Sequence, residues 1–192
     1  MNTLNKLLLV TLSTSVVLIA QPNKQNKQLQ QINKEGKNAS SKLLKTLGKN
    51  MKKNMKAGGP MKALDFCSNE AYALTEKVNT TLPKNVSVKR ISTNYRSPAN
   101  KPSTDELKVL KTFEDMKENN IVLPNKLVQK VDEHTYKFYK PLTIQKQVCL
   151  KCHGDIKDVE LRREIEKRYP LDKATGYKMG DLRGAVVVTI KK

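Results

Sequence analysis

Two cysteines and a histidine fall within five residues in the last third of the chain. Cys149, Cys152 and His153 form the pattern Cys-x-x-Cys-His. This spacing is the attachment signature of c-type haem. Each thiol can add across a vinyl group of the porphyrin to give a thioether, and the adjacent imidazole can then bind the iron from one side. The motif therefore predicts one covalently bound haem c, attached through Cys149 and Cys152, with His153 as an axial ligand.

Two other chemistries use closely spaced cysteines, and the sequence disfavours both. A redox-active dithiol of the thioredoxin type belongs to a βαβ context, which the residues around 149–152 do not show. A zinc site would need further ligands at a familiar spacing, and neither a second Cys-x-x-Cys nor a His pair follows the motif.

The spacing of residues does not identify the second axial ligand. The candidates are Cys67, His134, Met179, Met61, one of the many lysines, or water. Cys67 is notable because a third, unpaired cysteine is unusual in an exported protein. Ferric iron would bind it as the thiolate. A buried cysteine is most often just a small apolar residue, however, so this position stays open at this point.

The elements that must position these residues are helices and strands in mixed order. Apolar residues at steps of three and four predict a helix near 44–55 and another over 60–78, which places Cys67 on an inward face. Ala57-Gly58-Gly59-Pro60 separates the two helices. The remaining expected elements are strands at 85–92, 127–132, 135–142 and 184–190 and helices at 104–118 and 155–168. The strand at 184–190 is apolar throughout, which predicts burial on both faces.

The N-terminus indicates export. A short start with one positive side chain precedes an apolar run at 7–20, which is too short for the roughly 30 Å hydrocarbon core of a membrane. We expect residues 1–20 to be a signal peptide cleaved after Ala20, with an uncleaved anchor as the alternative. Residues 21–39 are rich in Lys, Gln and Asn and read as a linker. Residues 40–192 are then a single c-type haem domain in the periplasm.

The charge of the chain is strongly positive. Its 192 residues contain 37 Lys and Arg against 18 Asp and Glu, a net charge of +19. Residues 22–58 alone hold ten Lys and one Glu. Only six of the basic residues are Arg, and no aromatic residues are interleaved, so nucleic acid is not an expected partner. Contact of this Lys-rich arm with anionic lipid headgroups remains open. The sequence has a single apolar run, which excludes a polytopic membrane protein. Its three cysteines are too few for a disulfide scaffold.

Four stretches together resemble a family of exported bacterial c-type haem domains with a PAS-like fold, found as stand-alone cyanobacterial haem proteins and as receptor sensor modules. The stretches are 58–67, 88–102, 136–142 with the Cys-x-x-Cys-His motif, and 169–185. The resemblance spans about residues 40–192. It implies an α+β fold, with an antiparallel sheet flanked by helices behind a long N-terminal helical arm.

The resemblance also assigns roles to residues. It implies that Cys67 and His153 are the axial ligands, and that Arg96, Asn100 and Arg90 lie near the haem propionates. A thiolate ligand stabilises ferric iron and gives a low potential. We therefore expect a sensor of redox state or of a small gas, which works by ligand switching at Cys67 and signals to an unidentified partner protein. The alternatives are a low-potential electron-transfer cytochrome docking on acidic redox partners and, ranked lower, a haem peroxidase; we do not expect an enzyme.

Overall fold

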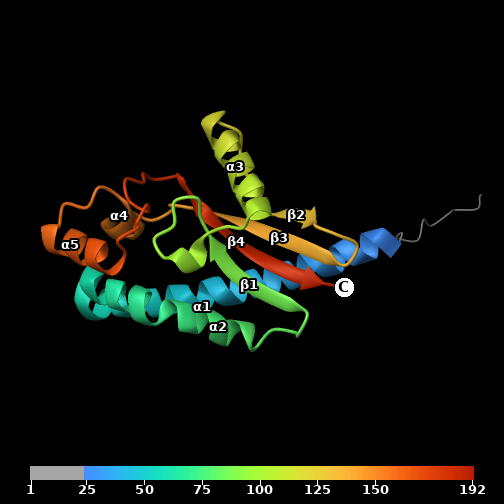
Figure 1. Cartoon of the computed structure of the whole chain (residues 1–192), viewed down its shortest axis with the longest axis horizontal. Helices are drawn as coiled ribbons and strands as arrows, with labels where there is room; N and C mark the ends of the chain where they lie inside the picture. Colours follow the sequence, from blue (N-terminus) through green and yellow to red (C-terminus); the bar gives the residue numbers. More distant parts are fainter. Residues whose placement is uncertain (1–23) are drawn as a thin grey trace, which may run out of the picture.

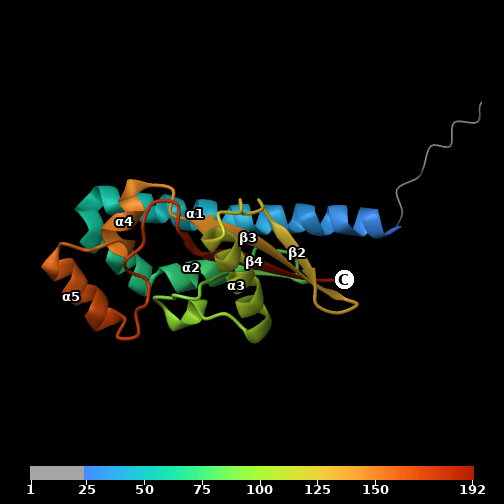
Figure 2. The ribbon, with the colours of Figure 1, turned by 90° about the horizontal axis from the view of Figure 1, so that it is seen from above.

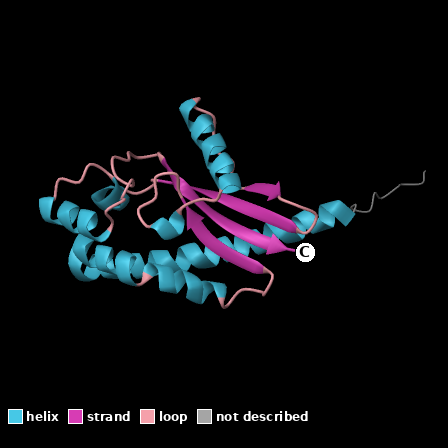
Figure 3. Cartoon of the chain, viewed as in Figure 1, coloured by secondary structure: helices cyan, strands magenta, loops and turns pink. Residues whose placement is uncertain are grey.

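The computed structural model describes residues 24–192, so the signal peptide expected at 1–20 lies outside the described residues. The elements are α1 (Lys24–Asn69), α2 (Ala71–Asn79), β1 (Val86–Ile91), a 3-10 helix (Pro98–Asn100), α3 (Thr104–Glu118), β2 (Leu127–Lys130), β3 (Thr135–Thr143), α4 (Gln147–His153), α5 (Val159–Arg168) and β4 (Leu182–Lys191). The α+β class with a long N-terminal helix is confirmed (Figure 1, Figure 3). The finer PAS-like assignment stays a prediction.

One four-stranded antiparallel sheet, in the order β1-β4-β3-β2, forms the centre of the molecule. The strand expected to be central is β4, which pairs with β1 on one side and β3 on the other. Its residues alternate between two cores. Val186 and Val188 pack with α1 and α2, whereas Ala185 and Val187 pack with α3. Burial of β4 on both faces explains why its sequence lacks polar alternation.

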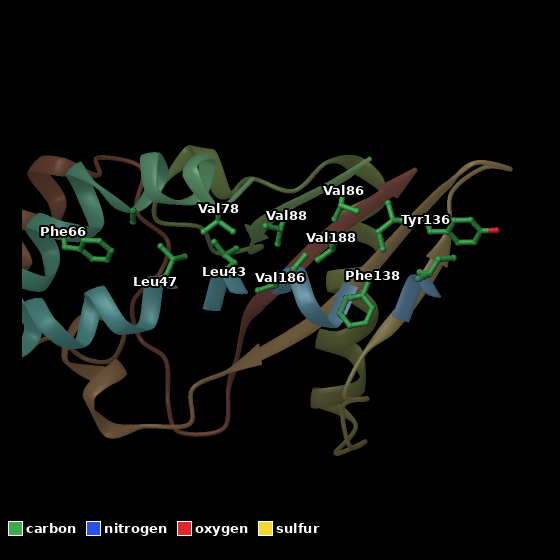
Figure 4. Close-up of a cluster of buried hydrophobic side chains, with 14 residues drawn as sticks. Leu43, Leu47, Phe66, Val78, Val86, Val88, Tyr136, Phe138, Val186 and Val188 are labelled. Carbon is green, nitrogen blue, oxygen red and sulfur yellow. The ribbon is translucent and has the colours of Figure 1, made fainter. Parts of the chain in front are cut away.

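The N-terminal part of α1 corrects the linker prediction for residues 21–39. Residues 24–39 are helical and continuous with the rest of α1, which runs along the sheet (Figure 2). Ile32 is fully buried and Ala39 is 1% exposed, and both belong to the core between α1 and the sheet. Figure 4 shows this cluster, in which Leu43 of α1 lies near Val186 and Val188 of β4. The face of residues 24–39 that contacts the sheet consists of single apolar or small residues separated by polar ones. The polar composition of the segment therefore gave no sign of a buried helix face. No helix within residues 24–192 has the length and apolar content needed to cross a membrane.

The close approach of α1 to β3 depends on Gly36. This glycine is buried, and a Cβ atom added to it would overlap the ring of Phe138 on β3. Further along the same helix, Gly48 is exposed, and a Cβ added there would meet nothing within 4 Å. A side chain at position 36 would therefore collide with the sheet, whereas a side chain at position 48 would meet no other protein atom.

The long helix reverses direction at Gly58 and Gly59, where the sequence predicted a break. Gly59 has φ 65° and ψ −156°, a conformation that side chains other than glycine rarely adopt. Pro60 follows and starts the returning segment, residues 60–69. The predicted helix over 60–78 is interrupted at Glu70, and α2 begins at Ala71. Residues 60–69 thus form a short helical segment bounded by a break at each end.

Gly36→Ala and Gly48→Ala should have opposite effects on stability. At Gly36 the added methyl must displace Phe138, so we expect a loss of about 1–2 kcal/mol in the free energy of unfolding. At Gly48 the substitution only removes backbone freedom within a helix, so for the protein without a bound ligand we expect a gain of about 0.5–1 kcal/mol. Urea unfolding of both variants beside the wild type measures the difference. A stabilising Gly36→Ala would contradict the packing described here.

Candidate functional site

A cavity of about 360 Å³ lies where the turn of α1 meets α4 and the end of the sheet. This volume is within the range of about 300–1,000 Å³ found for small-molecule sites. All four predicted iron or haem ligands line it, namely Cys67, Cys149, Cys152 and His153. Most of the remaining wall is apolar, contributed by α1, α4 and the segment that follows β3. The structure thus brings together residues separated by more than eighty positions in the sequence.

The helix α4 carries the Cys-x-x-Cys-His motif. Cys149 and Cys152 are three residues apart, so one helical face presents both thiols to the cavity. Neither forms a disulfide. Burial raises the pKa of the Cys152 thiol, an effect that Arg96 opposes and the nearby Cys67 and Cys149 reinforce. The three thiols are therefore close enough to affect one another electrostatically.

The orientation of His153 is fixed through its Nδ1 atom. Nδ1 lies 2.8 Å from the carbonyl oxygen of Ala174. Because a carbonyl only accepts, Nδ1 carries the proton and Nε2 keeps a free lone pair. Burial lowers the pKa of His153 to about 3, and Arg183 and Arg96 lower it further. The imidazole is thus neutral and held in the tautomer that metal-binding histidines use.

Cys67 lies in the last turn of the segment 60–69. Its side chain is accessible, and the accessible surface faces the cavity, with protein around it. Burial raises the pKa of the Cys67 thiol, while the charges of Arg90 and Arg96 lower it. Without a metal ion the thiol therefore stays protonated, and binding of a cation would favour the thiolate.

The other proposed axial ligands do not line the cavity. His134 is exposed at the turn between β2 and β3, and Met179 is 43% exposed in the loop before β4. Met61 packs beside α5, and no lysine within residues 24–192 lines the cavity. Sequence reasoning missed two soft sulfur atoms that do line it, those of Met51 and Met55. Among the candidates named from the sequence, the geometry favours Cys67.

Three arginines line this otherwise apolar cavity. Arg90 on β1 has no hydrogen-bond or ion-pair partner among residues 24–192, and burial lowers its pKa. Burial also lowers the pKa of Arg183. Arg183 donates to Ser92 Oγ at 2.7 Å and lies over the Tyr177 ring at 5.3 Å. Positive charge held in a desolvated site is costly unless an anion compensates it.

Arg96 has a structural contact that its predicted role did not anticipate. Its Nη2 donates to the carbonyl oxygens of Cys152 at 2.7 Å and Ala174 at 3.2 Å, and it pairs with Asp172 at 3.0 Å. Arg96 therefore joins the end of α4 to the loop that holds His153. Its Nε is buried and has no partner within the described chain, so this atom remains available to a ligand. Asn100, the third predicted contact, also lines the cavity.

Sequence reasoning did not single out Arg183. One signal was available: it is one of only six arginines and lies within the stretch 169–185 that carried the family resemblance. Arg183 is the second residue of β4, one position before the strand expected at 184–190, and had no spacing pattern that could reveal its direction. Pairing of β4 with β1 is what brings it beside Arg90 and Arg96 at the cavity.

The donors fit a haem better than a bare metal ion. Among residues 24–192, no three His, Cys, Asp or Glu side chains gather as ligands of one ion. Instead, two thiols and the imidazole come from α4, and a third thiol comes from residues 60–69 on another part of the wall. Gly48 also lines the cavity, and the open space in front of it leaves room for a flat ligand. The guanidinium of Arg90 and the unpaired Nε of Arg96 suit a ligand with carboxylates.

Comparison with known proteins extends this description. The sequence profile of the Tll0287-like family matches residues 17–191. The chain belongs to the Tll0287-like family. Its fold is similar to the crystal structure of the cyanobacterial haem protein Tll0287, with a TM-score of 0.54 and 19% sequence identity over 90% of this chain and 98% of that one. No curated protein matches the chain significantly in sequence. The family resemblance inferred from the sequence is therefore confirmed.

In this member of the Tll0287-like family, Arg96 should be important for stability. Arg96→Ala leaves Asp172 without its partner, and both side chains are only 9% exposed. We expect a loss of about 3 kcal/mol in the free energy of unfolding, since removal of one member of a buried pair leaves an uncompensated charge. Arg162→Ala, an exposed arginine on α5, is the matched control and should change stability by less than about 0.5 kcal/mol. Equal losses in the two variants, measured by urea unfolding, would contradict this role.

Proposed function

We propose that the protein is an exported c-type haem protein that binds one haem in this cavity. The observation that carries the proposal is the convergence of Cys149, Cys152, His153 and Cys67 on one apolar cavity. The two α4 thiols are placed to form the thioethers, and the free Nε2 of His153 is available to the iron. Bound haem supplies an iron that exchanges one electron and takes a ligand on each face. The apolar run at 7–20 supports export to the periplasm, where covalent haem is attached in bacteria.

The arginines are suited to the two propionates of a haem. Arg90 has no partner within the described residues 24–192, and Arg96 offers its unpaired Nε. Arg183 adds a third positive charge, which sequence reasoning did not include. A dianionic ligand would compensate charge that is otherwise held in a low-dielectric site. Of the predicted contacts, Arg90 and Asn100 are freer to bind a propionate than Arg96, which is largely used by Cys152, Ala174 and Asp172.

We propose a sensing role, based on the position of Cys67. As a thiolate, Cys67 stabilises ferric iron, and it is the ligand that would dissociate on reduction or on binding of a small gas. It lies in a short helical segment bounded by the turn at Gly59 and the break at Glu70. Release of Cys67 from the iron would therefore allow residues 60–69 to move relative to the rest of the protein, because the helix is interrupted at both ends of this segment.

The same segment provides a route from the cavity to the surface. Leu64 packs in a cluster with Leu161 and Ile165 of α5, and Asp65 pairs with Arg168 at 2.6 Å. A shift of residues 60–69 would thus move α5, whose first residue, Val159, is 57% exposed. A partner that reads the redox state would bind at this end of the molecule.

The ferric absorption spectrum tests the thiolate ligand. Cys67→Ala should replace the spectrum of a low-spin thiolate-bound haem with that of another ligand set, because the sulfur donor is lost. Met55→Leu is the control, since it changes another sulfur in the same cavity and should leave the spectrum unchanged. A wild-type spectrum in Cys67→Ala would exclude Cys67 as the ligand.

A redox titration separates sensing from electron transfer. We expect a midpoint potential below 0 mV for the wild type and a rise on the order of 0.1 V in Cys67→Ala, because thiolate favours the oxidised iron. CO should bind to the reduced wild type and change the protease sensitivity of residues near α5. A midpoint well above roughly 0 mV, with no structural response to CO, would favour the electron-transfer alternative.

A further inference from the structure

The lysines of α1 are arranged in one row. With 100° per residue, six of them fall within an arc of about 60° on the helix surface. All six are exposed, and they are Lys27, Lys34, Lys45, Lys49, Lys52 and Lys56. We call this row the lysine stripe. At 1.5 Å per residue it extends for about 44 Å, along most of the helix.

The lysine stripe lies on the exposed face of α1, and at its edge Lys34 also lines a hollow with Lys126 and Lys140. The residues of α1 that are buried against the sheet, such as Gly36 and Leu43, lie on the opposite face of the helix. Leu47 and Met51, which also line the cavity, lie on the same side of the helix, within about 60° of Gly36. A surface that contacts the stripe would therefore not meet the face of α1 that is buried against the sheet.

Acidic side chains do not neutralise the stripe. Residues 24–57 contain one acidic residue, Glu35. Its carboxylate accepts hydrogen bonds from Lys192 Nζ at 2.7 and 2.8 Å, so it is already paired. None of the six stripe lysines has an ion pair or hydrogen bond with another residue in the part of the chain that the structure describes. The positive charge along this face is thus available to an external partner.

We propose that the lysine stripe binds an anionic lipid bilayer, with α1 lying along the membrane surface. A straight row of flexible ammonium groups matches a plane of mobile lipid phosphates, and it lacks the arginines expected for recognition of a particular phosphate geometry. The apolar run at 7–20 ends three residues before α1 begins, so an uncleaved run held in a membrane would bring the start of the stripe to the same surface.

Vesicle co-sedimentation of the full chain tests the proposal. The probes are vesicles of phosphatidylcholine with phosphatidylglycerol and vesicles of phosphatidylcholine alone. The stripe variant combines Lys45→Gln, Lys49→Gln and Lys52→Gln, which preserve helix propensity. The control variant removes the same charge from exposed lysines on α2 and α3, by Lys77→Gln, Lys111→Gln and Lys117→Gln.

We expect the wild type to bind the anionic vesicles more tightly than the neutral ones, and binding to weaken as salt is added. Each stripe lysine should contribute about a fivefold factor to the partition coefficient. The stripe variant should therefore bind roughly a hundredfold more weakly, and the control variant only a fewfold more weakly. Lys27→Gln, Lys34→Gln and Lys56→Gln together, which leave residues 45–52 unchanged, should give the same loss if the first variant proves poorly folded.

Three outcomes would overturn the proposal. One is equal binding to neutral and anionic vesicles, which would assign membrane contact to the apolar run alone. Another is an equal loss in the stripe and control variants, which would make net charge rather than the row of lysines responsible. The last is complete displacement from the vesicles by duplex DNA at equal phosphate concentration, which would indicate a nucleic-acid surface instead.

Discussion

The reversal of α1 at Gly58 and Gly59 is the constraint on which the site depends. Only a glycine readily adopts φ 65° and ψ −156°, and this turn brings the segment 60–69 back along the helix that precedes it. Cys67 reaches the cavity because of that reversal, and α4 closes the cavity from the other side. The long first part of α1 is in turn fixed to the sheet through the close contact of Gly36 with Phe138. The turn and this contact together decide where the third thiol lies.

A second set of contacts maintains the opposite wall. The carbonyl oxygen of Ala174 accepts from both His153 and Arg96, and Arg96 also binds the last turn of α4. The Arg96 guanidinium therefore binds the carbonyl that orients the imidazole and links it to the motif helix, and its buried Nε has no partner among the described residues. Burial of Arg90, Arg96 and Arg183 with few acidic partners in the described chain costs free energy. An anionic ligand in the cavity would offset that cost. Binding of an anionic ligand to these arginines should therefore also stabilise the folded protein.

Much of this could be predicted from the sequence. The Cys-x-x-Cys-His motif, the Gly-Gly-Pro turn and the apolar β4 each carry a local pattern with a direct physical meaning. Residues 24–39 could not be predicted, because their buried face uses Gly36 and Ala39, whose small size matters only once the Phe138 ring is opposite. Arg183 was missed for a related reason, since its direction is set by the pairing of β4 with β1. Local periodicity reveals apolar faces, whereas close packing of small residues and convergence of distant charges appear only in three dimensions.

The central claim is that Cys149 and Cys152 on α4 hold one haem covalently in this cavity. Intact-mass spectrometry of the denatured protein, purified from cells with a cytochrome c maturation system, measures it directly. The account predicts a mass increase of one haem in the wild type, no covalent haem when both Cys149→Ser and Cys152→Ser are present, and full attachment in Cys67→Ser. A wild type without covalent haem under these conditions, or attachment that requires Cys67 instead of the α4 pair, would contradict it.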